Sequence, residues 1–228
     1  MKKILLFLLI IIMCFGLCSC KKEEEIINDK PNEDKIDEKV DIRKNITLQD
    51  IGLIVGEYSH KYTVIKVSNS NDRAIYVDVK LTYYNNNNEV VDNKNVYVRV
   101  GSKKSAYAIY ESFYEDPDFS TYKYDFDVST EKLESYESIY NNVKVTYIDT
   151  GKGIDIDFLN NGNVNTTASA YVLFRNNGNI VAINEVTEYD LMPLSKKTKS
   201  ISYPYKNSKK LISYDRIEVV LNEVSTEL

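Results

Sequence analysis

The feature that most constrains the fold is an internal repeat. Residues 67–91 align with residues 158–182 without a gap, at a constant shift of 91 positions. Turn residues coincide, since Asn69 falls on Asn160 and Asn85 falls on Asn176. Alternate apolar residues coincide as well, joining Val77, Val79, Leu81 and Tyr83 with Ala168, Ala170, Val172 and Phe174. A repeat of about 90 residues that is rich in short strands predicts two homologous β-domains.

Apolar and polar residues alternate through the body of the chain, where β-branched and aromatic types dominate. A period of two is typical of strands that bury one face. The segments 83–91 and 174–182 predict tight hairpins, because their Asn and Gly residues accept a positive φ. One helix is expected, at 129–140, as the connection between the domains. The predicted strands lie at 62–69, 74–84, 96–100, 122–128, 142–148, 153–159, 167–174 and 216–224.

Two short segments carry a family resemblance. Lys80–Asn85 reads KLTYYN, with Leu81 as the first apolar residue, and Tyr171–Asn176 reads YVLFRN. The first segment resembles the family of bacterial domains named after an F-x-L-Y-D motif, with Asn85 in place of Asp. The second segment departs further, because Arg175 stands where Tyr is expected.

This resemblance implies an Ig-like fold and a frequent place on cell-envelope lipoproteins, and it implies no particular activity. We therefore expect an all-β protein of two tandem Ig-like β-sandwich domains. The first domain is expected at residues 45–132 and the second at residues 133–228.

The N-terminus has the three-part layout of a secretory signal, with two lysines, an apolar run and then small residues. The run is too short for a comfortable membrane span. Its end resembles a bacterial lipobox, with Leu17 at −3, Ser19 at −1 and Cys20 at +1. In such sites a lipid is attached to the +1 thiol, so we expect residues 1–19 to be removed and Cys20 to carry the anchor. The alternative is an uncleaved signal anchor with incidental cysteines.

Charged residues dominate residues 20–44, with only scattered aliphatic side chains between them. Such a segment buries too little apolar surface to offset chain entropy, so a disordered tether is predicted. A short helix around 35–43 is the alternative. The expected location is extracytoplasmic, with the folded part anchored to the bacterial cell membrane by the lipid.

Composition narrows the class of partner. The chain carries 29 Lys and Arg against 34 Asp and Glu, a net charge of −5. A nucleic-acid partner is not expected, because neutralising phosphates needs clustered basic residues. The 3 cysteines all precede residue 21, so no disulfide is expected in the body. The expected partners are the membrane, through the lipid, and an envelope protein or polysaccharide.

Few residues suggest catalysis or metal binding. His60 is the single histidine, whereas transition-metal sites use sets of His and Cys. No serine lies in a G-x-S-x-G frame. The acidic stretch Glu115–Asp127 can offer oxygen ligands to a hard cation, although its spacing differs from that of an EF-hand. An acidic loop that runs into a strand is the alternative, and we predict no catalytic residue, no metal site and no cofactor.

Tyrosine is abundant, with 19 in the chain. Because Tyr combines apolar area with a hydrogen-bonding end, clustered tyrosines suit a glycan or protein interface. Packing on a sheet face is the alternative, since Tyr is a favoured strand residue. The candidate binding surface consists of Tyr107, Tyr110, Tyr114, Tyr122 and Tyr124.

The sequence thus favours a non-catalytic binding or interaction module of the cell envelope. The alternatives are a carboxylate-based hydrolase of cell-wall or external polymers and a purely structural spacer. A pocket with convergent carboxylates would favour the hydrolase, and fully polar outer sheet faces would favour the spacer.

Overall fold

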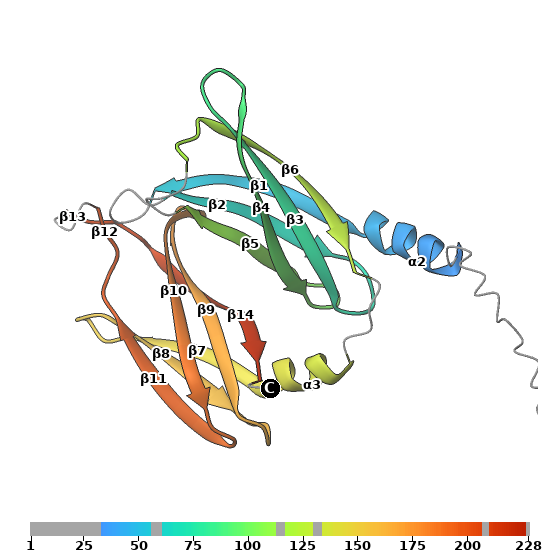
Figure 1. Ribbon diagram of the computed structural model, residues 1–228. Helices are drawn as coiled ribbons and strands as arrows, with labels where there is room; N and C mark the ends of the chain where they lie inside the picture. The colour runs from blue at the N-terminus through green and yellow to red at the C-terminus, as the bar shows by residue number, and fades with distance from the viewer. Residues whose placement is uncertain (1–32, 56–60, 113–116, 130–133, 207–209, 227–228) are drawn as a thin grey trace, which may run out of the picture. The chain divides into compact units, whose positions relative to one another are not determined.

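The computed structural model describes residues 33–55, 61–112, 117–129, 134–206 and 210–226 (Figure 1). Their regular structure is mostly antiparallel β-sheet, which confirms the predicted all-β fold. Within these residues no helix has the length and apolar character needed to cross a membrane. The expected signal peptide, residues 1–19, and Cys20 lie outside the described residues.

The N-terminal half, residues 33–129, contains two three-stranded sheets. Their strand orders are β1–β2–β5 and β4–β3–β6, with antiparallel neighbours throughout. The elements are α2 (Glu33–Lys44), β1 (Ile46–Val55), β2 (Lys61–Asn69), β3 (Ile75–Tyr84), β4 (Val90–Val100), β5 (Ser105–Ser112) and β6 (Thr121–Val128).

The C-terminal half, residues 134–226, repeats this organisation. Its three-stranded sheets have the orders β11–β8–β7 and β10–β9–β14, so that β8 takes the place of β2 and β9 takes the place of β3. A small β12–β13 pair is added. The elements are α3 (Glu134–Asn142), β7 (Val143–Asp149), β8 (Ile154–Asn160), β9 (Thr166–Asn176), β10 (Asn179–Leu191), β11 (Ser195–Ile201), β12 (Tyr205–Lys206), β13 (Lys210–Leu211) and β14 (Arg216–Ser225).

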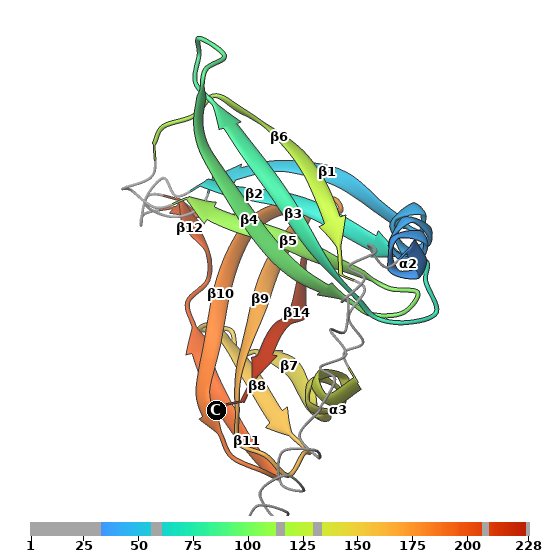
Figure 2. The ribbon, with the colours of Figure 1, turned by 45° about the vertical axis from the view of Figure 1, so that its right-hand side comes forward.

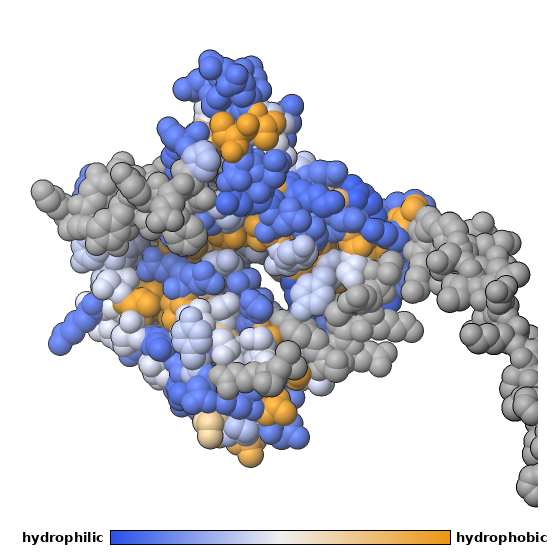
Figure 3. Space-filling view, viewed as in Figure 1, coloured by the Kyte–Doolittle hydropathy of each residue, from blue (hydrophilic) through white to orange (hydrophobic). Residues whose placement is uncertain are grey.

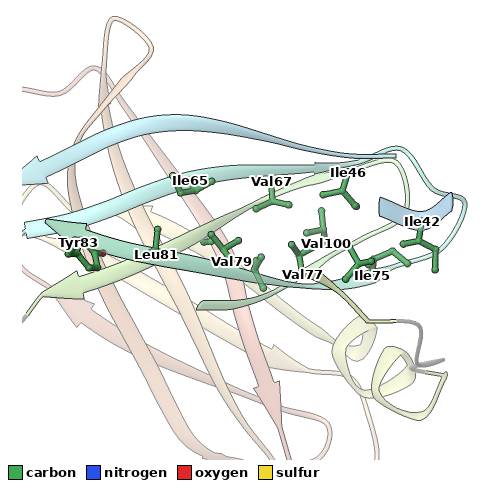
Figure 4. Close-up of a cluster of buried hydrophobic side chains, with 13 residues drawn as sticks. Ile42, Ile46, Ile65, Val67, Ile75, Val77, Val79, Leu81, Tyr83 and Val100 are labelled. Atoms are coloured by element: carbon green, nitrogen blue, oxygen red, sulfur yellow. The ribbon is translucent and has the colours of Figure 1, made fainter. Parts of the chain in front are cut away.

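Each half has an apolar core that comes from the inward residues of its strands. In β3 every second residue is buried, from Ile75 through Val77 and Val79 to Leu81 and Tyr83 (Figure 4). The second core is built in the same way around Phe158, Val172 and Phe174. The period of two read from the sequence therefore identifies the inward residues of β3 correctly.

Two buried asparagines show that the repeat extends to hydrogen bonds. The side-chain amides of Asn69 and Asn160, at the ends of β2 and β8, each donate to a carbonyl across the following turn and to one at the end of β4 or β10; Asn69 also donates to the Gly101 carbonyl at 3.1 Å. The equivalent acceptors are Arg73 and Val100 for Asn69, and Val164 and Leu191 for Asn160, at 2.8 and 3.0 Å in both halves. Each of these acceptors lies 91 residues from its counterpart, so the two turns have one construction.

The predicted hairpins are present, between β3 and β4 and between β9 and β10. Asn88 in the first turn has a φ of 61°, and Asn177 and Gly178 in the second have φ values of 49° and 83°. These are left-handed conformations, which Asn and Gly adopt at least cost. The Asn-rich composition of both segments is thus explained by turn geometry.

Residues 33–44 form α2, so the predicted disordered tether is wrong for this part and the alternative of a short helix is correct. Ile42 is 6% exposed and lies at the end of the first core, beside Ile46 and Ile75 (Figure 4). The charged side chains find partners on β6, where Lys39 Nζ lies 2.9 Å from a carboxylate oxygen of Asp127. Burial of Ile42 and these ion pairs stabilise the helix, although the segment as a whole contains few apolar residues. Residues 20–32 of the predicted tether lie outside the described residues.

The expected helix between the halves is α3, which begins at Glu134. Residues Asp34–Leu228 form one compact unit. The division into domains at 45–132 and 133–228 therefore stays a prediction.

Candidate binding cavity at the junction of the two halves

The two halves meet through an apolar cluster that is distinct from their own cores. Figure 2 shows the β1–β2–β5 sheet beside the β10–β9–β14 sheet. The outer face of the β1–β2–β5 sheet contributes Val64 and Ile109, and the outer face of the β10–β9–β14 sheet contributes Leu173 and Ile183. Val64 and Leu173 are fully buried. We call this cluster the junction, and its buried members are Tyr62, Val64, Ile109, Leu173, Ile180 and Ile183.

Arg99 on β4 fastens one side of the junction. Its guanidinium donates two hydrogen bonds to the Glu137 carboxylate on α3, at 2.7 and 2.5 Å. The same group stacks on the Tyr140 ring at 3.9 Å, and the Tyr140 hydroxyl donates to the Leu221 carbonyl on β14. Because only 8% of the Arg99 side chain is exposed, this bidentate pair is worth more than a surface ion pair.

Arg175 on β9 fastens the other side. Its Nη2 donates to the Tyr107 hydroxyl of β5 at 2.6 Å, and its Nε donates to Glu218 at 2.7 Å. The hydrogen bonds to Glu218 and Tyr107 raise the pKa of Arg175 against the opposing effect of burial. Each half thus contributes one arginine that holds the other half.

An acidic and tyrosine-rich group surrounds the apolar junction. The Tyr62 hydroxyl donates to Glu111 at 3.0 Å. Burial raises the pKa of Tyr171, and the charges of Glu185 and Glu111 raise it further. Burial also raises the pKa of the Glu185 carboxyl, and the charges of Glu111 and Glu223 add to the effect. Three carboxylates therefore repel one another beside this interface.

A cavity of about 400 Å³ lies where β4 and β5 of the N-terminal half approach β14 of the C-terminal half. An opening between the halves is visible near the centre of Figure 3. The volume is within the range of small-ligand sites, roughly 300–1,000 Å³. The lining residues are Tyr76, Asn95, Val96, Tyr97, Arg99, Ile109, Tyr110, Asn222 and Glu223.

The lining combines aromatic rings with amide and charged groups. Tyrosine rings can stack on a sugar face or a peptide side chain, and their hydroxyls can donate or accept hydrogen bonds. The amides of Asn95 and Asn222 offer further donors and acceptors. One carboxylate, Glu223, lines the cavity, whereas paired-carboxylate hydrolysis needs two that flank the bond to be broken. The described residues contain no group of three His, Cys, Asp or Glu placed to hold a metal ion.

The structure separates the predicted tyrosine surface. Tyr110 lines the cavity and also packs on the first core. Tyr107 lies at the junction and accepts the hydrogen bond from Arg175. Tyr122 packs on the first core and bonds to Asp50, and Tyr124 is exposed on β6. Tyr114 lies outside the described residues. Within the described part of the chain, the predicted tyrosines therefore do not form one continuous surface.

Sequence reasoning missed Tyr76, Tyr97 and Arg99 as cavity residues. The alternation in β4 does place Tyr97 and Arg99 opposite the buried Val98 and Val100, so their outward direction was readable. The approach of β14 to that face could not be predicted from the sequence pattern, because it depends on how the two halves pack.

The acidic stretch 115–127 does not converge on one point in its described part. Asp118 pairs with Lys61 at 2.7 Å, Asp125 pairs with Arg43 at 2.9 Å, and Asp127 pairs with Lys39. These carboxylates thus serve to fasten neighbouring elements. His60 lies outside the described residues.

No family model matches the chain, and no curated protein matches its sequence. Among solved structures, the YadV chaperone shares 7% identity at a TM-score of 0.24, over 80% of this chain and 100% of that one. Red sea bream transglutaminase shares 12% at 0.24, over 79% of this chain and 30% of that one. A chain of the chaperone-tip adhesin complex of CFA/I fimbriae biogenesis shares 9% at 0.22, over 81% and 98%. Scores this low support no functional argument.

Proposed function

We propose that this protein is a membrane-anchored extracytoplasmic lipoprotein that acts as a non-catalytic binding module of the cell envelope. The observation that carries the binding role is the tyrosine-lined cavity between β4, β5 and β14. The lipobox-like segment that ends at Cys20 supports the location.

The lining favours a polysaccharide segment as the ligand. Tyr76, Tyr97 and Tyr110 offer rings, and Asn95 and Asn222 offer side-chain amides that can bond to hydroxyl groups. Glu223 and Arg99 place both signs of charge at the site, so an ionic ligand of one sign gains little. An envelope protein that inserts an extended segment is the second class that such a lining accepts.

Binding to purified cell-wall polysaccharide tests this function. Tyr97 is 69% exposed, so Tyr97→Ala should leave stability nearly unchanged while it removes a stacking ring. We expect the dissociation constant to rise about tenfold, equivalent to about 1.4 kcal/mol. The matched control is Tyr124→Ala, because Tyr124 is also exposed but lies on β6 away from the cavity. Equal weakening by both variants would contradict a site in the cavity.

The anchor is tested separately. Cys20→Ala should abolish labelling by a radioactive fatty acid and release the protein from membranes, because the thiol is the attachment atom in a lipobox. Labelling that persists in this variant would contradict the lipoprotein assignment and leave the cavity proposal standing.

One observation favours the hydrolase alternative. Glu185 has a raised pKa beside Glu111 and Glu223, which is how a general acid is prepared in glycoside hydrolysis. Release of reducing ends from cell-wall polymers, lost in both Glu185→Gln and Glu223→Gln, would support hydrolysis and replace the binding module.

A further inference from the structure

The C-terminal half ends in a cluster of exposed apolar side chains. Leu194 is 80% exposed, Tyr189 68%, Met192 51% and Val164 40%. Val164 comes from the loop between β8 and β9, Met192 and Leu194 come from the loop between β10 and β11, and Tyr189 lies near the end of β10. We call these four residues the apolar tip. Orange and pale tan side chains mark this lower end of the C-terminal half in Figure 3.

Hydrogen bonds join the two loops into one surface. The Leu194 backbone N–H donates to the Gly162 carbonyl at 3.3 Å, and the Asn165 side chain donates to the Asp190 carboxylate. The Asn160 amide donates to the Leu191 carbonyl from beneath. The apolar side chains are therefore presented by a fixed backbone.

The repeat supplies the matching turn in the N-terminal half, and that turn is polar. The Lys103 backbone N–H donates to the Asn71 carbonyl at 3.3 Å, the bond that Leu194 makes to Gly162 91 residues later. Lys103 and Leu194 also share a left-handed backbone, with φ values of 54° and 52°. The same alignment places Met192 opposite Gly101.

This comparison shows that the turn does not need apolar side chains. Gly and Lys complete the same backbone geometry in the N-terminal half, so the left-handed conformation belongs to the turn itself. What distinguishes Leu194 is a large apolar side chain that is 80% exposed at this position. The turn geometry therefore does not explain why an apolar side chain is exposed at position 194.

We propose that the apolar tip inserts into the interfacial layer of a lipid bilayer. A projecting cluster of four side chains fits a soft apolar phase, whereas a stable protein partner needs roughly 800 Å² on each side. Tyr189 suits the boundary, since its ring is apolar and its hydroxyl can remain hydrated.

The charges behind the tip are compatible with headgroups. Lys196, Lys197 and Lys199 on β11 keep between 40% and 55% of their side chains exposed. They pair with Asp157 and Glu188, and Asp190 adds a further acid at the tip itself. Because these charges nearly balance, apolar insertion supplies most of the affinity and anionic lipid adds little.

This inference rests on the proposed membrane location but not on the lipid itself. The chain from Cys20 to Glu33 spans at most about 45 Å when fully extended, so an anchor at Cys20 would keep the body within reach of the bilayer. Weak binding of the apolar tip is then sufficient, because the anchored segment keeps the tip at a high local concentration near the bilayer.

The absence of tryptophan from the chain allows a clean test. Residues 20–228 with Cys20→Ser, which carries no lipid, would be given Leu194→Trp or, as the matched control, Lys103→Trp. With vesicles of phosphatidylethanolamine and phosphatidylglycerol, we expect Leu194→Trp emission to shift to the blue and to be quenched by brominated acyl chains. The Lys103→Trp emission should not change. No shift at Leu194→Trp, or equal shifts at both positions, would overturn the proposal.

A loss-of-binding variant completes the test. Met192→Gly with Leu194→Lys gives these two positions the residues found in the N-terminal half, so the fold should be kept. We expect its vesicle partition coefficient, measured by co-sedimentation, to fall at least about tenfold. Unchanged partitioning would overturn the proposal, as would a dimer of the parent chain that this variant dissolves in sedimentation velocity. Because Cys20 is replaced throughout, failure here does not bear on the lipid anchor.

Discussion

The two halves repeat one strand order but meet through opposite sheets. The N-terminal half covers the outer face of its β1–β2–β5 sheet, and the C-terminal half covers the outer face of its β10–β9–β14 sheet. At positions 91 residues apart, Val64 is fully buried at the junction whereas Asp155 bonds to Ser200 near the surface. Inward residues therefore set the shared fold, and outward residues decide which face is covered.

The largest expected effect comes from exchanging residues between equivalent outer faces. Val64→Asp places the residue of the C-terminal half in the apolar junction, where the arginines at either side, Arg99 and Arg175, already pair with Glu137 and Glu218. We expect the free energy of unfolding to fall by about 4 kcal/mol, because a buried charge loses its hydration. The measurement is urea unfolding followed by circular dichroism.

The reciprocal exchange is the control. Asp155→Val should change stability by less than about 0.5 kcal/mol, since that position is not covered by the other half. A similar loss in both variants would show that the two outer faces are not used differently.

The buried asparagines test what the halves share. Asn69→Ala and Asn160→Ala each remove a buried amide that donates to two equivalent backbone carbonyls, and Asn69 also donates to the Gly101 carbonyl. We expect each variant to lose about 2–3 kcal/mol, measured by thermal and urea unfolding. The exposed Asn163→Ala should lose almost nothing. Strongly unequal losses at the two asparagines would break the equivalence of the turns.

The helices that precede β1 and β7 sharpen the comparison further. A chain that begins at Asn45 lacks α2 and with it the burial of Ile42, so it should be about 2 kcal/mol less stable than one that begins at Glu33. Equal unfolding midpoints for the two chains would show that α2 does not stabilise the first core. Ile42→Ala in the longer chain should reproduce most of the loss.

The smallest effect concerns the acidic group at the junction. Because the pKa of Glu185 is raised in the folded state, its proton is held more tightly there than in the unfolded chain. Its stabilising contribution is complete below the unfolded pKa and is lost as pH rises through the folded value. Glu185→Gln should therefore stabilise the protein at pH 7, by less than about 1 kcal/mol given its exposure, and not at about pH 4. A gain that is independent of pH would contradict repulsion by Glu111 and Glu223.

The sequence predicted those parts of the fold that local pattern controls. Alternation located β3 and β9, and the Asn-rich segments located both hairpins. The disordered tether was wrong at residues 33–44, because composition over a window does not show that Ile42 can reach a core built from distant strands.

The candidate site was less predictable. Tyr110 was identified, while Tyr97 and Arg99 were not, because the cavity forms only where β14 approaches β4 and β5. One residue of β9 does reflect this packing. Leu173 is an apolar residue at an outward position, where alternation predicts a polar one, and its counterpart in the N-terminal half is Thr82. An apolar residue on the outward side of one repeat alone was the available signal.

The use of opposite sheets has a consequence for assembly. A contact between unlike faces is heterologous, so it does not close on itself and can be repeated by a further copy into a fibre. The outward side of β3 carries Asp78, Lys80 and Thr82, and the outward side of β8 carries Asp155 and Asp157, bonded to serine and threonine hydroxyls. Polar faces of this kind offer little apolar area to a further copy, as the outer faces of end repeats do in solenoid proteins.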